Sequence, residues 1–360
     1  MAEFRLETAV RRPEAERNAI LAAPGFGSNF SDHMVVIDWD RERGWHDHRI
    51  TGYAPFTLDP ASAVFHYAQE AFEGLKAYAH ADGSLWRFRA EVNAARFQRS
   101  ARRLALPELS TGDFLAGIDR LVEVDRDWVP RGAEQSLYLR PFMFAHSAFL
   151  AVKPSATVTY AVIASPSGAY FGGSGVQPVK IWFSREFSRA APGGTGFAKC
   201  GGNYAASMVA QQEAEAAGCS QVAFLDAVER RYVEELGGMN LFAVTADGRV
   251  ITPQLTDSIL EGVTRSAVLR LAADAGLAVE ERRLPQEELY QGIDDGSISE
   301  VFACGTAAII TPVASFADPD GVHVVAGGEP GATTLSLREQ LTEIQYGLRP
   351  DPYGWMHRIV

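Results

Sequence analysis

The run Gly193-Gly-Thr-Gly-Phe-Ala-Lys-Cys-Gly-Gly-Asn-Tyr204 places one lysine, Lys199, between two clusters of glycine. Lysine is rare in this chain: of its 33 basic residues (Lys plus Arg) only four are lysines, and the others are arginines. An arginine stays protonated at any working pH, whereas a desolvated lysine amine can lose its proton and condense with a carbonyl group. The run therefore predicts a reactive amine at Lys199. The alternative is a solvated cation on a flexible loop.

The glycines around Lys199 do not form a nucleotide-binding P-loop, which requires a Gly-Lys-Ser/Thr triplet. Ala198 precedes the lysine and Cys200 follows it. Two other glycine turns are candidates for binding a phosphate group: Leu260-Glu-Gly-Val-Thr-Arg265, which leads into a predicted helix, and Cys304-Gly-Thr-Ala-Ala308. Backbone N–H groups at a helix start bind anions. Each turn alone can be an ordinary helix cap, but the two together with a reactive lysine favour a phosphorylated ligand.

The segment Tyr232-Val-Glu-Glu-Leu-Gly-Gly-Met-Asn240 places two carboxylates side by side before a pair of glycines. Adjacent residues of an extended segment point to opposite faces, so we expect at most one of Glu234 and Glu235 to face inward. An inward carboxylate needs a cationic partner to stay ionised. Two solvated carboxylates in a turn are the alternative.

Aromatic side chains gather in two further segments, Phe65 to Gly74 and Ser136-Leu-Tyr-Leu-Arg-Pro141. In the second segment Tyr138 and Arg140 are two residues apart, which places them on one face of a strand. The eight histidines show no metal-ligand spacing, and we expect no metal site.

Composition restricts the class of protein. A chain of 360 residues with 47% hydrophobic and 22% charged residues is typical of a globular protein, and its length favours two domains. The net charge of −12 argues against a nucleic-acid partner. Three widely spaced cysteines indicate a reducing compartment. No secretory signal and no apolar run of about 18 residues is visible, so we expect a cytoplasmic protein without a membrane partner.

The pattern of helices and strands is mixed, without regular alternation, which predicts an α+β fold. We expect a smaller N-terminal domain over residues 1–164, of which 1–24 form a loose arm. The Gly/Pro-rich segment 165–178 predicts a linker. A second domain then covers residues 179–360, with a helix predicted at 204–217 and another beginning near Thr264. In the first domain, Asp82-Gly83 lies between two β-prone runs and predicts a hairpin, and Ser110-x-x-Asp113 predicts the cap of a helix.

Several motifs together resemble a known family. They are Phe30-Ser-Asp-His-Met34, Phe72-Glu-Gly-Leu-Lys76, Ser136-Leu-Tyr-Leu-Arg-Pro141, Gly201-Gly-Asn-Tyr204, Glu235-Leu-Gly-Gly-Met-Asn240 and Gly305-Thr-Ala-Ala308. In this order they resemble the branched-chain amino-acid aminotransferases of fold-type IV, which use pyridoxal 5′-phosphate. The resemblance covers nearly the whole chain. It implies a homodimer in which each subunit has a smaller N-terminal α/β domain and a larger, mixed, barrel-like C-terminal domain.

The resemblance also implies roles for individual residues. Lys199 would form the imine with the cofactor, Glu235 would bind the pyridine nitrogen, Tyr204 the phenolic oxygen, and Leu260 would pack on the ring. The phosphate would be bound by Arg89, Val263, Thr264 and Thr306. The substrate would contact Phe30, Tyr67, Phe72, Tyr138, Arg140, Ala307 and Ala308. The implied reaction transfers the amino group of leucine, isoleucine or valine reversibly to 2-oxoglutarate.

Some positions depart from other members of the family. Mammalian members carry a redox-active CxxC where this chain reads Ala307-Ala-Ile-Ile-Thr-Pro312, and a hydroxyl residue in place of Gly238. We therefore expect no thiol regulation of that kind. Two alternatives stay open: another enzyme of the same fold (a D-amino-acid aminotransferase or a lyase resembling aminodeoxychorismate lyase), or a non-catalytic protein that binds a phosphorylated ligand.

Overall fold

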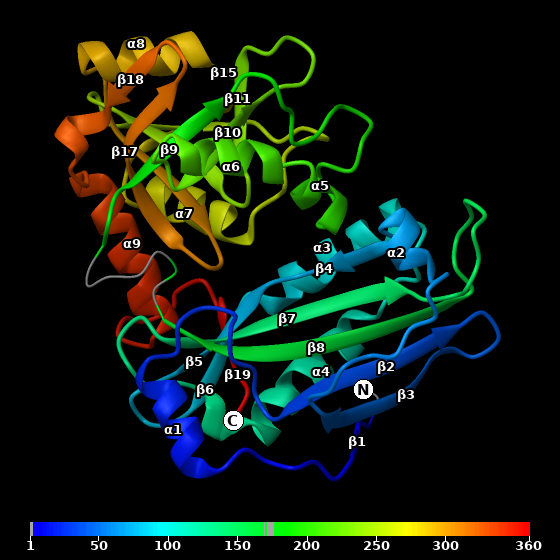
Figure 1. The fold of residues 1–360 in the computed structure, drawn as a ribbon. Coiled ribbons are helices and arrows are strands. Elements are labelled where there is room, and N and C mark those ends of the chain that lie inside the picture. Colours follow the sequence, from blue (N-terminus) through cyan, green and yellow to red (C-terminus); the bar gives the residue numbers. More distant parts are fainter. Residues whose placement is uncertain (1–2, 169, 171–175) are drawn as a thin grey trace. The chain divides into compact units, whose positions relative to one another are not determined.

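The computed structural model describes residues 3–168, 170 and 176–360 (Figure 1). The chain forms two compact units. Unit 1 comprises Met1–Gly172, Ala198–Gly201 and Ile344–Val360. Unit 2 comprises Gly173–Phe197 and Gly202–Glu343. Unit 1 is thus built from three separate segments of the chain, and the short second segment contains Lys199.

Unit 1 is built on one large sheet. Its described strands are β1 (Arg5–Leu6), β2 (His33–Asp40), β3 (Gly44–Gly52), β4 (Glu70–Phe72), β5 (Leu75–Ala79), β6 (Leu85–Phe88), β7 (Ser136–Ala145), β8 (Thr157–Ser167) and β19 (Met356–Arg358). The order is β1-β3-β2-β8-β7-β5-β6-β19, and β4 pairs with β7. The long strands β2, β7 and β8 pair antiparallel at its centre. The hairpin predicted at Asp82-Gly83 is confirmed, because β5 pairs antiparallel with β6.

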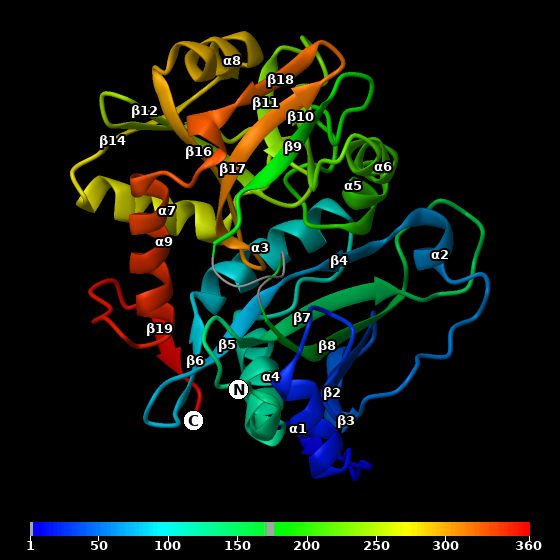
Figure 2. The same ribbon diagram turned by 60° about the vertical axis from the view of Figure 1, so that its left-hand side comes forward.

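The described helices of unit 1 are α1 (Glu14–Ala22), α2 (Ala63–Tyr67), α3 (Ala90–Arg103), α4 (Thr111–Val124) and the short 3₁₀ turn η1 (Arg126–Trp128) (Figures 1 and 2). Of these, α4 packs against β2 and β8, and α3 packs against α4 and β4. The aromatic rings of Phe97 on α3, Phe114 on α4 and Tyr160 on β8 contact one another in the core. The predicted cap of α4 is confirmed, since Ser110 Oγ accepts the backbone N–H of Asp113 at 3.0 Å.

Unit 2 contains a closed ring of strands. Its described strands are β9 (Val179–Ser184), β10 (Gln221–Leu225), β11 (Tyr232–Leu236), β12 (Asn240–Thr245), β13 (Arg249–Pro253), β14 (Ala278–Arg282), β15 (Leu284–Pro285), β16 (Ile298–Gly305), β17 (Ile309–Asp318) and β18 (Gly321–Val324). Pairing follows β12-β16-β17-β9-β10-β11, and β11 also pairs with β12 through Glu235 and Asn240. Ring closure of this kind makes a barrel.

The remaining helices are α5 (Gly201–Ala205), α6 (Met208–Ala216), α7 (Val263–Asp274), α8 (Gln286–Asp295), α9 (Ala332–Gln345) and the 3₁₀ segment η2 (Val325–Gly328). The sequence predicts one helix over 204–217, but the structure divides it into α5 and α6. The division has a local cause. The backbone N–H and the hydroxyl of Ser207 both donate to the carbonyl of Tyr204, at 3.0 and 2.7 Å, which makes a tight turn.

The predicted loose arm and the predicted linker both contain regular structure. Within residues 3–24, β1 pairs in parallel with β3, and α1 forms a helix without a fully buried residue. β8 continues to Ser167, inside the predicted linker 165–178. Residues 169 and 171–175 of that linker lie outside the described part of the chain.

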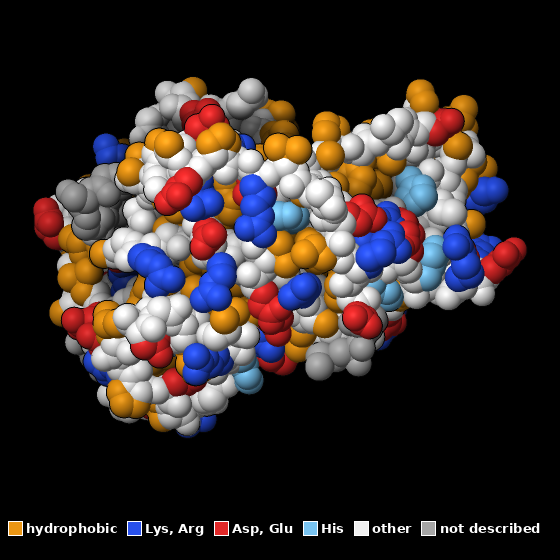
Figure 3. All heavy atoms as spheres, turned by 90° about the horizontal axis from the view of Figure 1, so that it is seen from below, with side chains coloured by type: hydrophobic (Ala, Val, Ile, Leu, Met, Phe, Trp, Pro, Cys, Tyr) orange, Lys and Arg blue, Asp and Glu red, His pale blue; other side chains and the backbone are white. Residues whose placement is uncertain are grey.

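Acidic and basic side chains are interspersed on the face drawn in Figure 3, with apolar side chains between them. Among the described residues, no helix combines the length and the apolar character that crossing a lipid bilayer requires.

Candidate active site

The backbone around Lys199 is fixed by three hydrogen bonds within unit 1. The N–H of Lys199 donates to Ser100 Oγ on α3 at 2.9 Å. Its carbonyl accepts the N–H of Phe72 on β4 at 3.0 Å. Two residues on, the N–H of Gly201 donates to the carboxylate of Glu70. The backbone from Lys199 to Gly201 is therefore held against the sheet and α3, as a positioned nucleophile requires and a solvated loop cation does not.

Gly201 allows the carboxylate of Glu70 to approach the backbone. A Cβ atom at this position would lie 2.7 Å from Glu70 Oε1, so any other residue would displace this carboxylate. Burial raises the pKa of Glu70, although the N–H of Gly201 and the charge of Arg140 oppose this shift. The first glycine of the second cluster, Gly201, thus leaves room for the acceptor of its own N–H next to the lysine.

A fully buried carboxylate, Glu73, lies within electrostatic reach of Lys199. Arg96 donates to Glu73 from Nε at 2.7 Å and from Nη2 at 2.8 Å, and Asn93 Nδ2 donates at 2.8 Å. Burial alone would raise the pKa of Glu73, but Arg96, Lys199 and Asn93 outweigh it and hold this pKa below its ordinary value. A negative charge on Glu73 therefore acts on the Lys199 amine.

Four of the predicted site residues lie together in unit 1. Lys199 Nζ lies 4.8 Å from the ring centroid of Phe72, and the guanidinium of Arg140 lies 4.9 Å from the same ring. Arg140 Nη2 also donates to the hydroxyl of Tyr138 at 3.2 Å. Gly74 makes room for that hydroxyl, since a Cβ there would lie 2.0 Å from it. This group joins an amine, an aromatic face and a guanidinium.

The other predicted site residues of unit 1 have different neighbours. Phe30 stacks on Tyr53 with ring centroids 5.0 Å apart. Tyr67 stacks on Phe149, at 6.4 Å, and its hydroxyl donates to the carbonyl of Leu150. Neither contact involves Lys199.

Arg89 occupies a strained backbone position at the start of α3. Its φ of +48° lies in the left-handed region that non-glycine residues rarely adopt, and such strain is concentrated at functional sites. Its N–H donates to the carbonyl of Trp355 at 2.8 Å, and its guanidinium lies 5.3 Å from the Trp355 ring. Partial burial lowers the pKa of Arg89. These contacts hold a half-buried cation beside Trp355, and a cation held in this way suits an anion site.

In unit 2 the buried carboxylate of Glu235 has a cationic partner. Arg189 Nη2 lies 2.5 Å from Glu235 Oε1, and both side chains are almost completely buried. The N–H of Leu260 donates to Oε1 at 2.9 Å, and Asn240 Nδ2 donates to Oε2 at 3.2 Å. Glu235 is thereby held by residues from three separate segments of the unit.

The expectation that at most one of Glu234 and Glu235 is buried is wrong. The two side chains do point to opposite faces of β11, but both faces are covered, and the exposed fractions are 6% and 2%. Glu234 accepts the hydroxyl of Ser258, and burial raises its pKa. Arg189 acts electrostatically on Glu234 as well as on Glu235.

The start of α7 is joined to the Glu235 group. Asn240 Nδ2 donates to the carbonyl of Leu260 at 3.0 Å. Its Oδ1 packs so closely on Gly262 that a Cβ atom there would lie only 2.1 Å from it. Gly262 is the N-cap of α7 and provides no side-chain cap, while Val263 and Thr264 form the buried first turn. The positive end of a helix dipole thus lies next to the predicted ring-binding residues.

Tyr204 and the β16–β17 turn complete the predicted residues of unit 2. The position of a Cβ on Gly238 would lie 4.0 Å from the Tyr204 ring, so Tyr204 approaches the glycine turn that follows Glu235. Thr306 and Ala307 are half-buried, and the carbonyl of Ala308 accepts the hydroxyl of Thr311 at 3.2 Å. Ile309 has a φ of +63°, an unusual value for a β-branched residue.

Four residues that hydrogen-bond or pair with the backbone of Lys199 and Gly201 or with Glu235 were not singled out from the sequence: Ser100, Glu70, Arg189 and Asn240. Glu70 and Asn240 lie inside or beside quoted motifs, which was a usable signal. Ser100 and Arg189 had none, because a serine in an amphipathic helix and an arginine in an irregular loop look ordinary. No group of three or more His, Cys, Asp or Glu side chains suited to a metal occurs in the described ranges.

Comparison with known proteins agrees with the fold-type IV architecture. The sequence model of the family described as "Amino-transferase class IV" matches residues 70–316. Proteins called branched-chain-amino-acid aminotransferase from Mycolicibacterium smegmatis and Mycobacterium tuberculosis are each 54% identical over 350 residues, which cover 96% of this chain and 95% of theirs. A probable branched-chain-amino-acid aminotransferase of Streptomyces coelicolor is 54% identical over 347 residues, covering 96% of this chain and 95% of its own.

Solved structures are similar too. The crystal structure of the Escherichia coli branched-chain amino acid aminotransferase has a TM-score of 0.75 at 29% identity and covers 90% of this chain and 99% of its own. The branched-chain aminotransferase of Thermoproteus uzoniensis, solved with norvaline, has a TM-score of 0.74 at 26% identity and covers 91% and 100%. Another branched-chain amino acid aminotransferase, solved with pyridoxamine 5′-phosphate, has a TM-score of 0.73 at 30% identity and covers 90% and 98%. The expected fold class, with its barrel-like second unit, is confirmed. This chain belongs to the class IV aminotransferase family.

Proposed function

We propose that this protein uses pyridoxal 5′-phosphate to transfer the amino group of leucine, isoleucine or valine reversibly to 2-oxoglutarate. The observation that carries the proposal is the fixed backbone of Lys199, bonded to Ser100, Phe72 and Glu70 next to an aromatic and cationic surface. Relatives called branched-chain-amino-acid aminotransferases, at 54% identity, support the choice of substrate.

The residues present suit the three polar parts of this cofactor. Lys199 offers an amine for its aldehyde. Glu235, charge-compensated by Arg189, offers a buried carboxylate for a protonated ring nitrogen. The first turn of α7, with Val263 and Thr264, offers backbone N–H groups and the positive end of a helix dipole for its phosphate. The chain thus offers an amine for the aldehyde, a carboxylate for the ring nitrogen, and backbone N–H donors for the phosphate.

When bound, pyridoxal phosphate supplies an electron sink that weakens the bonds to the substrate α-carbon. The protein residues provide position and proton transfer. Glu235 would keep the ring nitrogen positively charged, and Tyr204 would hydrogen-bond the phenolic oxygen. Leu260 would pack on the ring. Arg89 and the hydroxyls of Thr264 and Thr306 would bind the phosphate.

Lys199 has two tasks. Its amine would hold the cofactor, and the same amine would take the proton from the substrate α-carbon as a general base and give it back as a general acid. The negative charge of Glu73 acts on this amine, and the backbone hydrogen bonds of Lys199 fix the position from which its side chain extends. Two half-reactions of this type give ping-pong kinetics.

Substrate binding uses apolar and cationic side chains together. Phe30, Tyr67, Phe72 and Tyr138 provide aromatic surface for a branched alkyl group, and the amides of Ala307 and Ala308 bind its carboxylate. Arg140, held over Phe72 and against the Tyr138 hydroxyl, meets the second carboxylate of 2-oxoglutarate or glutamate. Aromatic surface and a guanidinium are the groups needed to accept both an aliphatic and an acidic side chain.

We also propose a homodimer. Apolar side chains on unit 1 are left exposed near α2 and the β7–β8 loop: Phe65 is 60% exposed, Leu150 73% and Val152 88%. Exposed apolar side chains that cluster in this way mark protein–protein contacts. The dimer predicts that Leu150→Asp with Val152→Asp gives a monomer in light scattering, whereas Val10→Asp, which changes a 96% exposed side chain on the N-terminal segment, leaves the dimer intact.

The experiment that tests the function is a panel of amino acids with 2-oxoglutarate as acceptor. Leucine, isoleucine and valine should form glutamate, with parallel lines in double-reciprocal plots. Turnover of D-alanine, or release of pyruvate without amino transfer, would instead favour another enzyme of this fold. A protein that binds the cofactor but converts no substrate would favour the binding function.

A further inference from the structure

A second pocket lies in unit 1, and no role in transamination is assigned to its residues. It has a volume of about 460 Å³ and lies beside α1 and the segment from η1 to the start of β7. Residues Arg17, Asn18, Leu21 and Ala22 line it from one face of α1, since they are spaced as neighbours on a helix. The other lining residues are Arg126, Asp127, Val129, Pro130, Arg131, Gly132 and Gln135.

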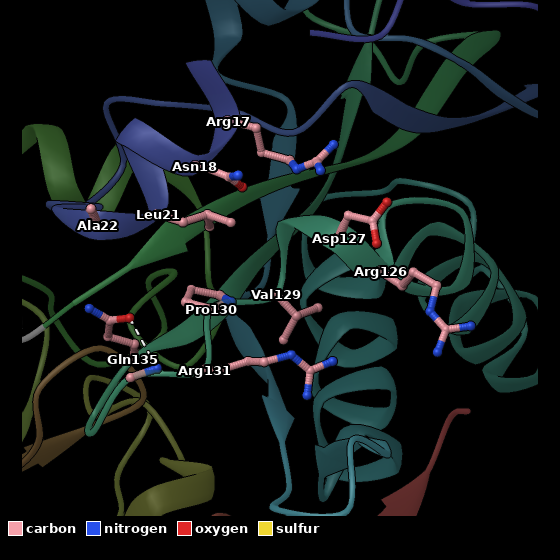
Figure 4. A pocket seen from close by; sticks show the side chains of 11 residues that line it. Arg17, Asn18, Leu21, Ala22, Arg126, Asp127, Val129, Pro130, Arg131 and Gln135 are labelled. Atoms are coloured by element: carbon pink, nitrogen blue, oxygen red, sulfur yellow. Dashed lines mark hydrogen bonds between the residues drawn. The ribbon is translucent and has the colours of Figure 1, made fainter. Parts of the chain in front are cut away.

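The charges of this pocket are unbalanced. Three guanidinium groups, of Arg17, Arg126 and Arg131, stand against the single carboxylate of Asp127, which leaves two net positive charges. In Figure 4 the charged ends of these four side chains point to the same side of the view, away from Ala22 and Gln135. A local positive charge of this kind contrasts with the net charge of −12 for the whole chain.

The three arginines also lack partners in the described part of the chain. No hydrogen bond or ion pair joins any of their guanidinium groups to a described residue, and Arg17 Nε is shielded from water without an acceptor. Arginines elsewhere are commonly paired, as Arg87 is with Glu91 and Asp119, or Arg185 with Asp318 and Asp320. Neighbouring positive charges repel one another, and a buried N–H donor without an acceptor destabilises the fold. An anion bound in this pocket would reduce the repulsion and supply the missing acceptor.

We propose that this pocket binds a small molecule with at least two negative charges, carried by phosphate or carboxylate groups. Arginine presents a planar set of N–H donors that matches both groups in a bidentate manner. The remaining lining offers apolar contact from Leu21, Val129 and Pro130, and an amide from Asn18. The volume admits a molecule of the size of pyrophosphate or citrate and is far larger than a chloride ion.

Calorimetric titration of the protein saturated with pyridoxal phosphate tests the proposal. Pyrophosphate represents phosphate ligands and citrate represents carboxylate ligands, both at constant ionic strength maintained with sodium chloride. We expect saturable one-to-one binding of at least one probe, and the tighter of the two identifies the anionic group. Absence of saturable binding by both probes would overturn the proposal.

Variants locate the binding. Arg17→Gln with Arg131→Gln removes two charges from the pocket and should weaken binding at least about tenfold, because each charge-assisted hydrogen bond contributes that much. The matched control is Arg11→Gln with Arg41→Gln, which removes the same charge from two exposed arginines outside the pocket. The control should bind as the unmodified protein does. Equal loss in both variants, or unchanged binding in the first with its thermal melting intact, would contradict a site in this pocket.

Discussion

The backbone N–H of Lys199 donates to the hydroxyl of Ser100, 99 positions earlier in the chain, at 2.9 Å. Ser100 is fully buried on α3, so this bond links Lys199 to a 14-residue helix of unit 1. A nucleophile must be held within a fraction of an ångström to act efficiently. The bond therefore predicts that a serine without contact to any reacting atom affects turnover.

Ser100→Ala should lower kcat by up to about a hundredfold, because the lysine loses one of its backbone restraints. The unmet N–H should also cost about 1–3 kcal/mol of stability. Steady-state kinetics and thermal melting measure the two effects. Ser136→Ala is the matched control, since Ser136 is also buried but bonds to Ser167. A variant at Ser100 with unchanged kcat would show that this restraint has no role in turnover.

Glu70 should act through its oxygen rather than its charge. The N–H of Gly201 needs an acceptor, and the raised pKa of Glu70 shows that burial already disfavours its ionised form. Glu70→Gln keeps an acceptor and should retain most of the activity, whereas Glu70→Ala should lose about tenfold or more in kcat/KM. Equal activities of the glutamine and alanine variants would refute a role as backbone acceptor.

Glu73 should give stability that depends on pH. Its pKa in the folded protein is below the ordinary value, so its contribution is complete above the unfolded pKa of about 4.3 and is lost as pH falls through the folded pKa. Glu73→Gln should lower the urea midpoint at pH 7, because Arg96 loses its buried partner. The gap to the unmodified protein should stay constant from pH 7 to 5 and narrow below about pH 4.3. A gap that widens on acidification would reverse the predicted sign.

Arg189 should be essential for the stability of unit 2. Arg189→Met leaves the buried Glu235 without its cationic partner, a change that costs about 3–5 kcal/mol when one member of a buried pair is removed. Adding Glu235→Met removes the second charge and should recover much of the loss, although the double variant should be inactive. Urea denaturation of the three proteins measures this. Equal stability of the single variant and the unmodified protein would show that the pair contributes nothing.

Local signals predicted much of the fold. The Ser110-x-x-Asp113 pattern located the start of α4, and Asp82-Gly83 located a hairpin, because both depend on neighbouring residues only. The division of the helix predicted over 204–217 was missed because the carbonyl of Tyr204 accepts a side-chain hydroxyl, which periodicity does not detect.

The residues that position the site were harder to predict. Glu70 meets Gly201 across 131 positions and Ser100 meets Lys199 across 99, so neither spacing leaves a pattern in the sequence. The burial of both Glu234 and Glu235 also depends on distant elements, since Ser258 and Arg189 approach β11 after the chain has folded. The motifs predict which residues act, and the tertiary structure shows which side chains hold their backbone and carboxylates in place.

The central claim is that the amine of Lys199 carries the cofactor. Reduction of the purified protein with sodium borohydride, followed by peptide mapping by mass spectrometry, tests it most directly, because the chain offers only four lysines: Lys76, Lys153, Lys180 and Lys199. The account predicts a stable phosphopyridoxyl adduct on Lys199. It also predicts that the variant Lys199→Ala forms no such adduct and has no transamination activity. An adduct confined to another lysine, or no adduct in an active protein, would contradict it.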